Sequence, residues 1–459
     1  MTIDTGEFIS LIEKLKADKK SLFLGYKGEK PRFSTFEDSL SVNCGFSASS
    51  SGFISPSVAV HAGPVIVVSS RSGISDTTTD FRRAISDHFG GEIFDISFDS
   101  ENANYVTWNP LTICNTWDGA ERMARAMINL GPELETSHLS EAKTINVFAA
   151  FLYIANFRGM SFRELKKQFA TDSCEFFLSD AKAIREWTKS CKAQGVEAKS
   201  EVGFEGTSES FYALKTAFEE LKNYRDYVVK KRTKGIQVEI AGTSEILGSI
   251  YVAFDKIKKT LKSIDAVDVD DAYQFDFHAF VRSHGTIYLD VARGSEPNPL
   301  VGAFLKEAMH QWSHASSIPH WSRTETLLVV LDETLELAPI TNLPDRIGSL
   351  YKDAIQMITV LHSGFHAQQM WGSSVGTFFQ NMSNHVFLPG YLDSGYFAKN
   401  KDMLVKSGVE ESTKHGFFNP ETGSAHILTF DNGAKIRDVT NPDIGQIVDK
   451  ATIDLQLGL

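Results

Sequence analysis

The sequence lacks the features that mark secreted, disulfide-stabilised proteins. Its 459 residues include only four cysteines, and no two of them have the CxxC spacing of a zinc ribbon or a redox motif. The cysteines are Cys44, Cys114, Cys174 and Cys191. Residues 1–12 have neither the basic nor the apolar region of a signal peptide. These absences exclude a disulfide framework, and we expect reduced thiols in a cytoplasmic protein.

Long hydrophobic runs are also missing. The longest mainly apolar segment, residues 145–157, contains Asn146 and Asn156. It is shorter than the roughly 20 apolar residues that a helix needs to cross a bilayer. We therefore expect a buried helix there and no transmembrane segment in this chain.

The chain has no excess of positive charge. It contains 46 Lys and Arg against 58 Asp and Glu, a formal net charge of −12. This balance argues against a protein that coats nucleic acid with its whole surface, although it allows a local basic channel. With 42% hydrophobic and 23% charged residues, the composition is that of a globular protein. The length allows about three domains, or one large domain with an insertion.

Short apolar runs alternate with helical patterns near the start of the chain. An amphipathic helix at 8–20 is followed by a turn-rich connector through Gly25, Gly28 and Pro31. We then expect strands at 39–45, 63–70 and 92–98, with a helix at 78–88. Alternation of this kind is typical of a parallel sheet covered by helices.

Helical periodicity dominates the middle of the chain, and strand patterns return after it. The expected helices are 117–129, 140–157, 161–169, 179–194, 207–231 and 243–262. Later segments predict strands at 285–292, 326–331, 353–362 and 384–390, a helix at 297–314 and a hairpin within 415–440. This order favours one β/α core that is interrupted by a helical insertion.

The strongest chemical signal is the run LLVVLDETLELAPI at 327–340, in which a buried strand ends in Asp332 and Glu333. This is the pattern of a Walker B element. One carboxylate at the carboxyl end of the strand holds Mg²⁺ through water, and a second orients the attacking water. Ligands of open α/β sheets bind at this end of the strands. The alternative is a strand followed by an acidic helix start.

A phosphate-binding loop would have to precede that strand, and the candidate is NCGFSASSSGFISPS at 43–57. It departs from the G-x-x-x-x-G-K-[ST] pattern, in which Lys reaches the phosphates and a hydroxyl holds Mg²⁺. In the register we prefer, Asn43 and Ala48 occupy the glycine positions, Ser49 the lysine position and Ser50 the hydroxyl position. The alternative is an ordinary serine-rich loop.

The order of these segments resembles the TraG/TraD-like coupling proteins of type IV secretion and conjugation, which are FtsK/HerA-type ring-forming ATPases. The segments that carry the resemblance are 23–42, the serine-rich tract, 63–78, 93–111 with its WNPL, 277–292, 327–340, 360–372 and 386–390. The resemblance implies an α/β fold with a RecA-like P-loop NTPase core and a mostly parallel sheet, interrupted by an all-helical insertion domain. The implied boundaries are 33–115 and 275–400 for the core, 116–274 for the cargo- or partner-binding insertion, 1–32 for an N-terminal helix and connector, and 401–459 for a C-terminal hairpin and tail.

The resemblance also implies a site for ATP and Mg²⁺. Its catalytic residues would be Asp332, Glu333 and His362, and its Mg²⁺ ligands Ser50 and Asp332. Its nucleotide-binding residues would be Gly45, Ser47, Ala48, Ser49, Ser50 and Ser51.

Three departures from the family pattern affect this site. Ser49 replaces the family's lysine, and His362 and His366 stand where it usually has Gln. The turn at 351–354 also lacks the usual arginine. Phosphoryl transfer depends on positioned positive charge, and an arginine finger alone contributes about 10³–10⁵ in rate. We therefore expect impaired or absent ATP hydrolysis.

One segment of the insertion is basic. Residues 222–262 contain ten Lys and Arg and four Asp and Glu, a local charge of +6. The candidate nucleic-acid contacts are Lys230, Lys231, Arg232, Lys234, Lys256, Lys258 and Lys259. A solvated helix face, or a surface for a protein partner, would have the same composition.

These inferences predict a coupling-protein-like component of a conjugative or type IV secretion system. It would bind DNA or a DNA–protein cargo, contact other secretion proteins and assemble in a homo- or hetero-oligomeric ring. Because the family's N-terminal membrane helices are absent, we expect a cytoplasmic protein, peripheral at the inner face of the cell membrane. The alternatives are an active ATP-driven DNA or protein translocase with an atypical P-loop, and a DNA-binding accessory protein without a nucleotide role.

Overall fold

The computed structural model describes most of the chain outside the end of the insertion and the C-terminal tail. The described residues are 5–27, 30–44, 51–70, 73–98, 106, 108–128, 138–170, 174–194, 275–291, 299–316, 325–337, 340, 342–388, 426–431 and 435–440, with single positions and pairs between 198 and 261.

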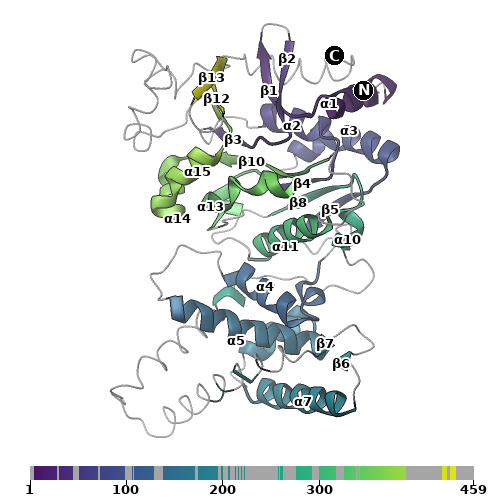
Figure 1. Ribbon diagram of the computed structural model, residues 1–459, viewed down its shortest axis with the longest axis vertical. Helices are drawn as coiled ribbons and strands as arrows, with labels where there is room; N and C mark the ends of the chain where they lie inside the picture. Colours follow the sequence, from purple (N-terminus) through teal and green to yellow (C-terminus); the bar gives the residue numbers. More distant parts are fainter. Residues whose placement is uncertain are drawn as a thin grey trace.

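A nine-stranded sheet forms the centre of the molecule, in the order β13-β12-β11-β3-β10-β9-β4-β8-β5 (Figure 1). The seven strands from β11 to β5 are all parallel. They are β3 (Leu40–Asn43), β4 (Val65–Ser69), β5 (Ile93–Ser97), β8 (Thr286–Asp290), β9 (Leu327–Leu331), β10 (Ile355–Leu361) and β11 (Asn384–Phe387). The hairpin of β12 (His426–Asp431) and β13 (Lys435–Thr440) extends the sheet at β11 in antiparallel pairing. The predicted mostly parallel α/β sheet is thus confirmed.

Both faces of the sheet are buried, which explains why its strands are continuous apolar runs. In β4, Val65 and Val67 pack into one hydrophobic cluster, whereas Ile66 and Val68 pack into another on the opposite face. The first face is covered by α2 (Ser51–Val60), α3 (Gly73–Phe89) and, outside them, α1 (Thr5–Ala17). The second face is covered by helices that connect the later strands, and the helices that follow β5 lie beyond them, with α4 (Trp117–Ile128) packed on α11 (Pro299–Ser316) (Figure 1).

The helices on this side of the sheet form two groups. Those connecting the later strands are α10 (Phe277–Phe280), α11 (Pro299–Ser316), α12 (Thr334–Leu337), α13 (Leu343–Ile347), α14 (Gly364–Trp371) and α15 (Val375–Asn381), with 3₁₀ turns η3 (Leu350–Asp353) and η4 (Gly372–Ser374). The others follow β5 and begin with the 3₁₀ turn η1 (Pro110–Ile113), which precedes α4 (Trp117–Ile128), α5 (His138–Phe157), α6 (Phe162–Ala170) and α7 (Cys174–Ala193).

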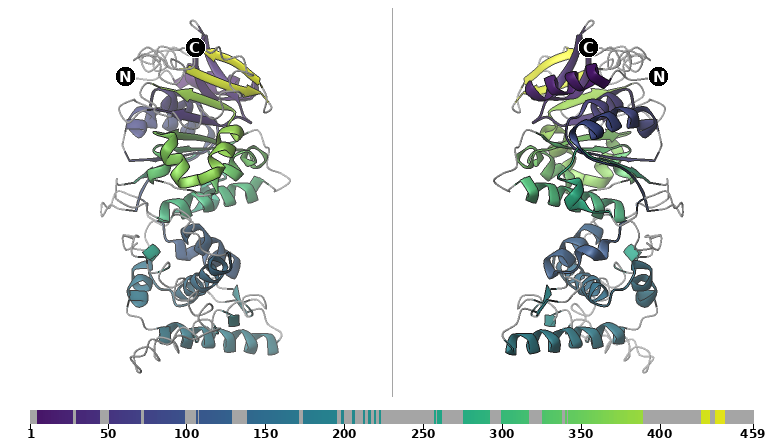
Figure 2. Two further views of the ribbon diagram at one scale, coloured as in Figure 1. Left: turned by 90° about the vertical axis from the view of Figure 1, so that its left-hand side faces the viewer. Right: turned by 90° about the vertical axis from the view of Figure 1, so that its right-hand side faces the viewer.

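The helical region that follows β5 lies to one side of the sheet, and α4 joins it to the core by packing on α11 (Figures 1 and 2). It also contains the short strands β6 (Ala198–Lys199) and β7 (Glu205–Gly206). The predicted helices at 207–231 and 243–262 lie mostly outside the described residues. Among the described helices, none is long and apolar enough to cross a lipid bilayer.

The predicted turn-rich connector after the first helix is wrong. The chain forms an antiparallel hairpin there, with β1 (Lys20–Lys27) paired to β2 (Lys30–Thr35). Leu22 and Phe23 are buried, and the Phe23 and Phe33 rings lie 5.8 Å apart. Gly25 and Pro31, which suggested turns, lie within the two strands instead. A two-stranded ribbon tolerates them because its outer edges need no further hydrogen-bonding partner.

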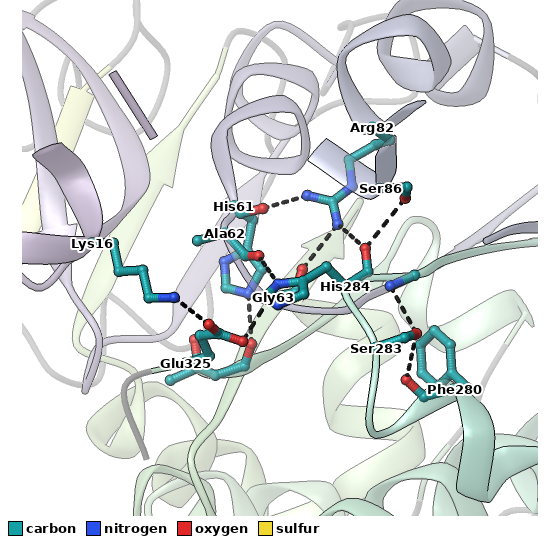
Figure 3. Close-up of polar contacts among 12 residues, drawn as sticks. Lys16, His61, Ala62, Gly63, Arg82, Ser86, Phe280, Ser283, His284 and Glu325 are labelled. Carbon is teal, nitrogen blue, oxygen red and sulfur yellow. Dashed lines mark hydrogen bonds and ion pairs between the residues drawn. The ribbon is translucent and has the colours of Figure 1, made fainter. Parts of the chain in front are cut away.

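The edge at which β4 and β8 begin is closed by a buried arginine (Figure 3). Arg82 of α3 is fully buried and donates to the carbonyl oxygens of His61, Gly63 (2.9 Å) and His284 (3.2 Å). Its Nε donates to Thr286 Oγ1 at 2.7 Å. Burial lowers the pKa of Arg82 to about 10. The guanidinium thereby satisfies backbone oxygens where strands and helix ends converge, which is a structural role.

A charged cluster continues this network toward α1 (Figure 3). Glu325, before β9, pairs with Lys16, and its Oε2 lies 3.4 Å from His284 Nδ1. The same His284 nitrogen lies 2.7 Å from the carbonyl oxygen of Ala62. Protein groups therefore occupy this edge of the sheet, and the candidate site lies at the opposite one.

Candidate functional site

Three adjacent strands, β3, β10 and β9, end at the same edge of the sheet. Their parallel pairing places Asn43 opposite Leu361, and Thr359 opposite Leu331. Neighbouring strands lie about 4.8 Å apart, so the ends of β3 and β9 are separated by roughly 10 Å. The sheet therefore brings the start of the serine-rich tract and the acidic pair to one edge, with β10 between them.

The acidic pair directly follows β9. The Asp332 amide donates to the Val68 carbonyl oxygen at 2.9 Å, which extends the pairing with β4 by one residue. Ser69 Oγ donates to Asp332 Oδ2 at 3.2 Å, and Ser70 Oγ donates to Glu333 Oε2 at 2.9 Å. The two carboxylates are thus oriented by hydroxyl groups from the end of β4.

Glu333 has an unusual backbone conformation. Its φ is 58°, in the left-handed region that non-glycine residues rarely adopt, and its side chain is only 7% exposed. The next residue, Thr334, anchors this bend, because its hydroxyl donates to the Leu331 carbonyl and accepts from the Val360 amide at 3.1 Å. Strained positions of this kind cluster at functional sites, where the surrounding structure holds them in place.

The end of β10 presents His362 beside the end of β3. His362 Nδ1 lies 3.5 Å from Cys44 Sγ, and the Cys44 amide donates to the Leu361 carbonyl oxygen at 3.0 Å. The predicted strand-end position of His362 is confirmed by the bounds of β10. His366 lies one turn into α14, so the two imidazoles do not share a helix face.

The serine-rich tract connects β3 to α2, which is the strand–loop–helix arrangement of a phosphate-binding loop. Ser51 is the first residue of α2. The other predicted nucleotide-binding residues, Gly45, Ser47, Ala48, Ser49 and Ser50, lie outside the described residues. Their contacts with nucleotide stay a prediction.

The basic segment of the insertion is also mainly outside the described residues. Lys259 is described and exposed, whereas Lys230, Lys231, Arg232, Lys234, Lys256 and Lys258 are not described. The nucleic-acid contacts therefore stay a prediction.

Sequence reasoning missed Ser69 and Ser70. Ser69 is the last residue of β4 and Ser70 directly follows it, in the run VIVVSS, and nothing local distinguishes them from a polar strand end. The signal that could have identified them is that β4 is a buried strand parallel to β9. The residues at its carboxyl end therefore lie at the same edge of the sheet as Asp332. Within the described residues, no three His, Cys, Asp or Glu side chains form a metal-binding group.

The donor set at this edge fits Mg²⁺. Mg²⁺ prefers oxygen ligands, keeps several of its waters and needs only one or two carboxylates. Asp332 supplies a carboxylate at the strand end, and Ser69 holds that carboxylate in place. Bound Mg²⁺ would neutralise phosphate charge, and Glu333 lies next to Asp332 where it can orient a water molecule.

Comparisons with known proteins identify the fold. No protein-family model matches the sequence, and no curated protein sequence matches it. The solved structure of the bacterial conjugative coupling protein TrwBdeltaN70, in its unbound monoclinic form, matches with a TM-score of 0.56 and 14% sequence identity, over 94% of this chain and 90% of that one.

Two nucleotide complexes of the same coupling protein match similarly. The complex of TrwB with the ATP analogue ADPNP has a TM-score of 0.56 and 14% identity, covering 94% of this chain and 92% of that one. The complex with ADP and Mg²⁺ has a TM-score of 0.53 and 14% identity, over 88% and 86% of the two chains. At this level of identity the likeness concerns the fold. The chain therefore has the RecA-like α/β fold of a conjugative coupling protein, as its resemblance to the TraG/TraD-like proteins implies.

Proposed function

We propose that this chain is a coupling-protein-like component of a conjugative or type IV secretion system, with a nucleotide site whose ATP hydrolysis is impaired or absent. It acts as a cargo-binding, ring-assembling subunit that works at the cytoplasmic face of the cell membrane. One observation supports the proposal most directly. The strands β3, β10 and β9 end at the same edge of the sheet, so the start of the serine-rich tract, which has no lysine, lies at the same edge as the acidic pair Asp332 and Glu333.

The division of roles follows from the side chains at this edge. Backbone N–H groups of the tract and the start of α2 bind the nucleotide phosphates, because a helix N-terminus attracts anions. Asp332 and Ser50 hold Mg²⁺. Glu333 is positioned to orient water, and its position is supported by the hydrogen bond from Ser70. With Ser49 in the lysine position, the transition-state charge lacks its main positive partner within this chain.

Nucleotide binding and turnover test this proposal directly. Calorimetry with Mg-ATP on the purified full chain should show weak binding, and hydrolysis should be undetectable or far below 0.1 s⁻¹. Turnover above about 0.1 s⁻¹ that disappears in Glu333→Gln would contradict impaired hydrolysis, since active enzymes commonly work at about 1 s⁻¹ or faster. That result would favour the ATP-driven translocase.

Cargo binding is the second part of the proposal. The basic segment at 222–262, within a chain of net charge −12, is the proposed contact for DNA phosphates. Binding of a DNA duplex should weaken with added salt, and Lys230→Gln, Lys231→Gln and Arg232→Gln together should reduce both the affinity and the salt dependence. Sedimentation of the chain with and without DNA measures whether a ring forms. DNA binding without any nucleotide binding would support the accessory-protein alternative.

A further inference from the structure

Two histidines lie one helical turn apart on the outer side of α11. His310 and His314 are both exposed, and their imidazole rings are nearly parallel, with centroids 6.4 Å apart. Because residues four positions apart are neighbours on a helix surface, the two side chains share one face of α11. We call these two residues the α11 histidine pair.

Packing against the core fixes this orientation of α11. On the other side of the helix, Phe304, Ala308 and Trp312 are buried in the core. The Trp312 Nε1 donates to the carbonyl oxygen of Ala354 at 3.0 Å, and Ala354 directly precedes β10. The end of α11 that carries the histidine pair therefore lies near the edge of the sheet at which β10 begins, opposite the candidate nucleotide site.

The described charged groups beside the pair balance one another. Arg122 of α4 pairs with Asp118 and lies 3.5 Å from Glu307 of α11. With Lys306, one turn before the pair, these groups carry no net charge that would repel a metal ion. His314 lies in the last turn of α11, where the helix dipole is negative and stabilises a cation.

The His310 ring is neutral at pH 7. Partial burial and the nearby Arg122 hold the pKa of His310 below its ordinary value of 6.5. A metal ion binds a ring nitrogen that carries no proton, so a neutral imidazole is ready to act as a ligand. Imidazole nitrogens favour Zn²⁺, Ni²⁺ and Cu²⁺, whereas Mg²⁺ and Ca²⁺ prefer oxygen ligands.

Histidines at this spacing can share one metal ion, as the two histidines of the helical H-E-x-x-H zinc motif do. An imidazole that binds through one nitrogen at about 2.1 Å has its centroid roughly 3.2 Å from the ion, so two such rings lie no more than about 6.4 Å apart. The rings of the α11 histidine pair are at this limit. Because both side chains are exposed, rotation about their bonds brings both nitrogens onto one ion.

We propose that the α11 histidine pair is a binding site for a divalent transition-metal ion. In the part of the chain that the structure describes, no third His, Cys, Asp or Glu side chain joins the pair, so water fills the remaining coordination positions. The nitrogen ligands distinguish this site from the candidate nucleotide site, whose oxygen donors fit Mg²⁺. The proposal therefore does not depend on nucleotide binding or on the proposed function.

Calorimetric titration of the full chain with NiCl₂ tests the site, after bound metal has been removed with EDTA and in the presence of excess MgCl₂. The wild type should bind Ni²⁺, because Mg²⁺ does not compete for imidazole nitrogens. His310→Gln and His314→Gln each remove one ligand, and each should lower the affinity for Ni²⁺ by about tenfold or more. Each variant stays informative if the other does not fold.

Electron paramagnetic resonance of Cu²⁺ bound to the full chain identifies the ligands. Cu²⁺ binds nitrogen ligands more tightly than Ni²⁺ does. The wild-type spectrum should show coupling to two nitrogen nuclei, and the spectrum of either variant should show coupling to at most one. An indirect effect of a substitution on folding would not change the ligand count in this way. A wild-type spectrum without nitrogen coupling would contradict the proposal.

Two further variants serve as matched controls. His88→Gln removes an exposed imidazole from α3 and should bind Ni²⁺ like the wild type. His366→Gln removes one member of the other described histidines four positions apart, and it should also keep the wild-type affinity. The proposal is overturned if the wild type binds no Ni²⁺, if both α11 variants keep the wild-type affinity, or if binding is lost in His366→Gln and retained in the α11 variants.

Discussion

The Ser70 hydroxyl donates to Glu333 Oε2 at 2.9 Å, which joins the end of β4 to the end of β9. The two residues are 263 positions apart in the sequence, and only the parallel pairing of their strands brings them together. Since Glu333 also has a φ of 58°, this hydrogen bond helps to hold a backbone conformation that its residue type disfavours.

The strain at Glu333 predicts an order of stability for two substitutions. Glu333→Gly and Glu333→Ala both remove the carboxylate that accepts from Ser70, but only alanine keeps a Cβ in the left-handed region. Glu333→Gly should therefore be the more stable of the two by about 1 kcal/mol. Urea unfolding of both variants measures the difference. Equal stabilities, or a more stable alanine variant, would show that the backbone at this position carries no strain.

The lysine position of the serine-rich tract predicts a gain of nucleotide affinity. Ser49→Lys, alone or with Ala48→Gly, should strengthen ATP binding at least several-fold if the tract lies against phosphates, because the added ammonium contacts the β- and γ-phosphates. Calorimetry with Mg-ATP measures the affinity of each variant for ATP. Ser47→Lys, two residues earlier, is the control for the effect of an added positive charge. An equal gain in both variants would indicate a nonspecific charge effect and not a phosphate-binding loop.

The buried guanidinium of Arg82 predicts a large loss of stability on substitution. Arg82→Met leaves carbonyl oxygens of His61, Gly63 and His284 without this donor and should lower the free energy of unfolding by about 3 kcal/mol or more. Arg83, the next residue, is 59% exposed, and Arg83→Met should change the stability by no more than about 0.5 kcal/mol. Chemical denaturation of the wild type and of both variants measures these free energies of unfolding. Similar losses in both variants would contradict a structural role specific to Arg82.

The buried His61 predicts a loss of stability at acidic pH. Its Nε2 lies 2.7 Å from the Thr326 carbonyl oxygen, and burial lowers its pKa from 6.5 to about 3. Between these two values the unfolded state binds the proton and the folded state does not. The free energy of unfolding should therefore fall as the pH drops from 6.5 toward 3, by up to about 1.4 kcal/mol per pH unit from this group.

His61→Gln keeps a donor for Thr326 and removes the titrating group, so its stability should fall less steeply over the same range. His385, also buried, has its pKa lowered to about 4 and contributes a similar slope that remains in this variant. His88→Gln removes a 48% exposed imidazole and serves as the control. Urea unfolding at several pH values gives the slopes, and identical slopes in the wild type and His61→Gln would refute this assignment.

Much of the core could be predicted because its strands are buried on both faces. The runs at 65–69, 327–331 and 355–361 are apolar at nearly every position, and such runs indicate parallel strands without any knowledge of their neighbours. The hairpin of β1 and β2 escaped prediction, because Gly25 and Pro31 suggest turns in a local reading. Its stability comes from packing of Leu22 and Phe23, which are contacts that local sequence does not specify.

Arg82 and Arg83, neighbours in one helix, also show that local sequence does not specify which side chains become buried. Both follow Asp80 in a polar-looking segment, and their residue types alone assign both to the surface. The fold buries Arg82 because its side chain faces the start of β8, whereas Arg83 pairs with Asp80 in solvent.

By itself, the sequence determined the α/β class, the acidic pair at the end of a buried strand and the absence of a lysine from the serine-rich tract, because these depend on residue type and short spacing. The tertiary structure alone decided that β10 lies between β3 and β9, and that Ser69 and Ser70 orient the acidic pair. Strand order and contacts between segments far apart in the sequence depend on burial of the whole chain, which no short segment encodes.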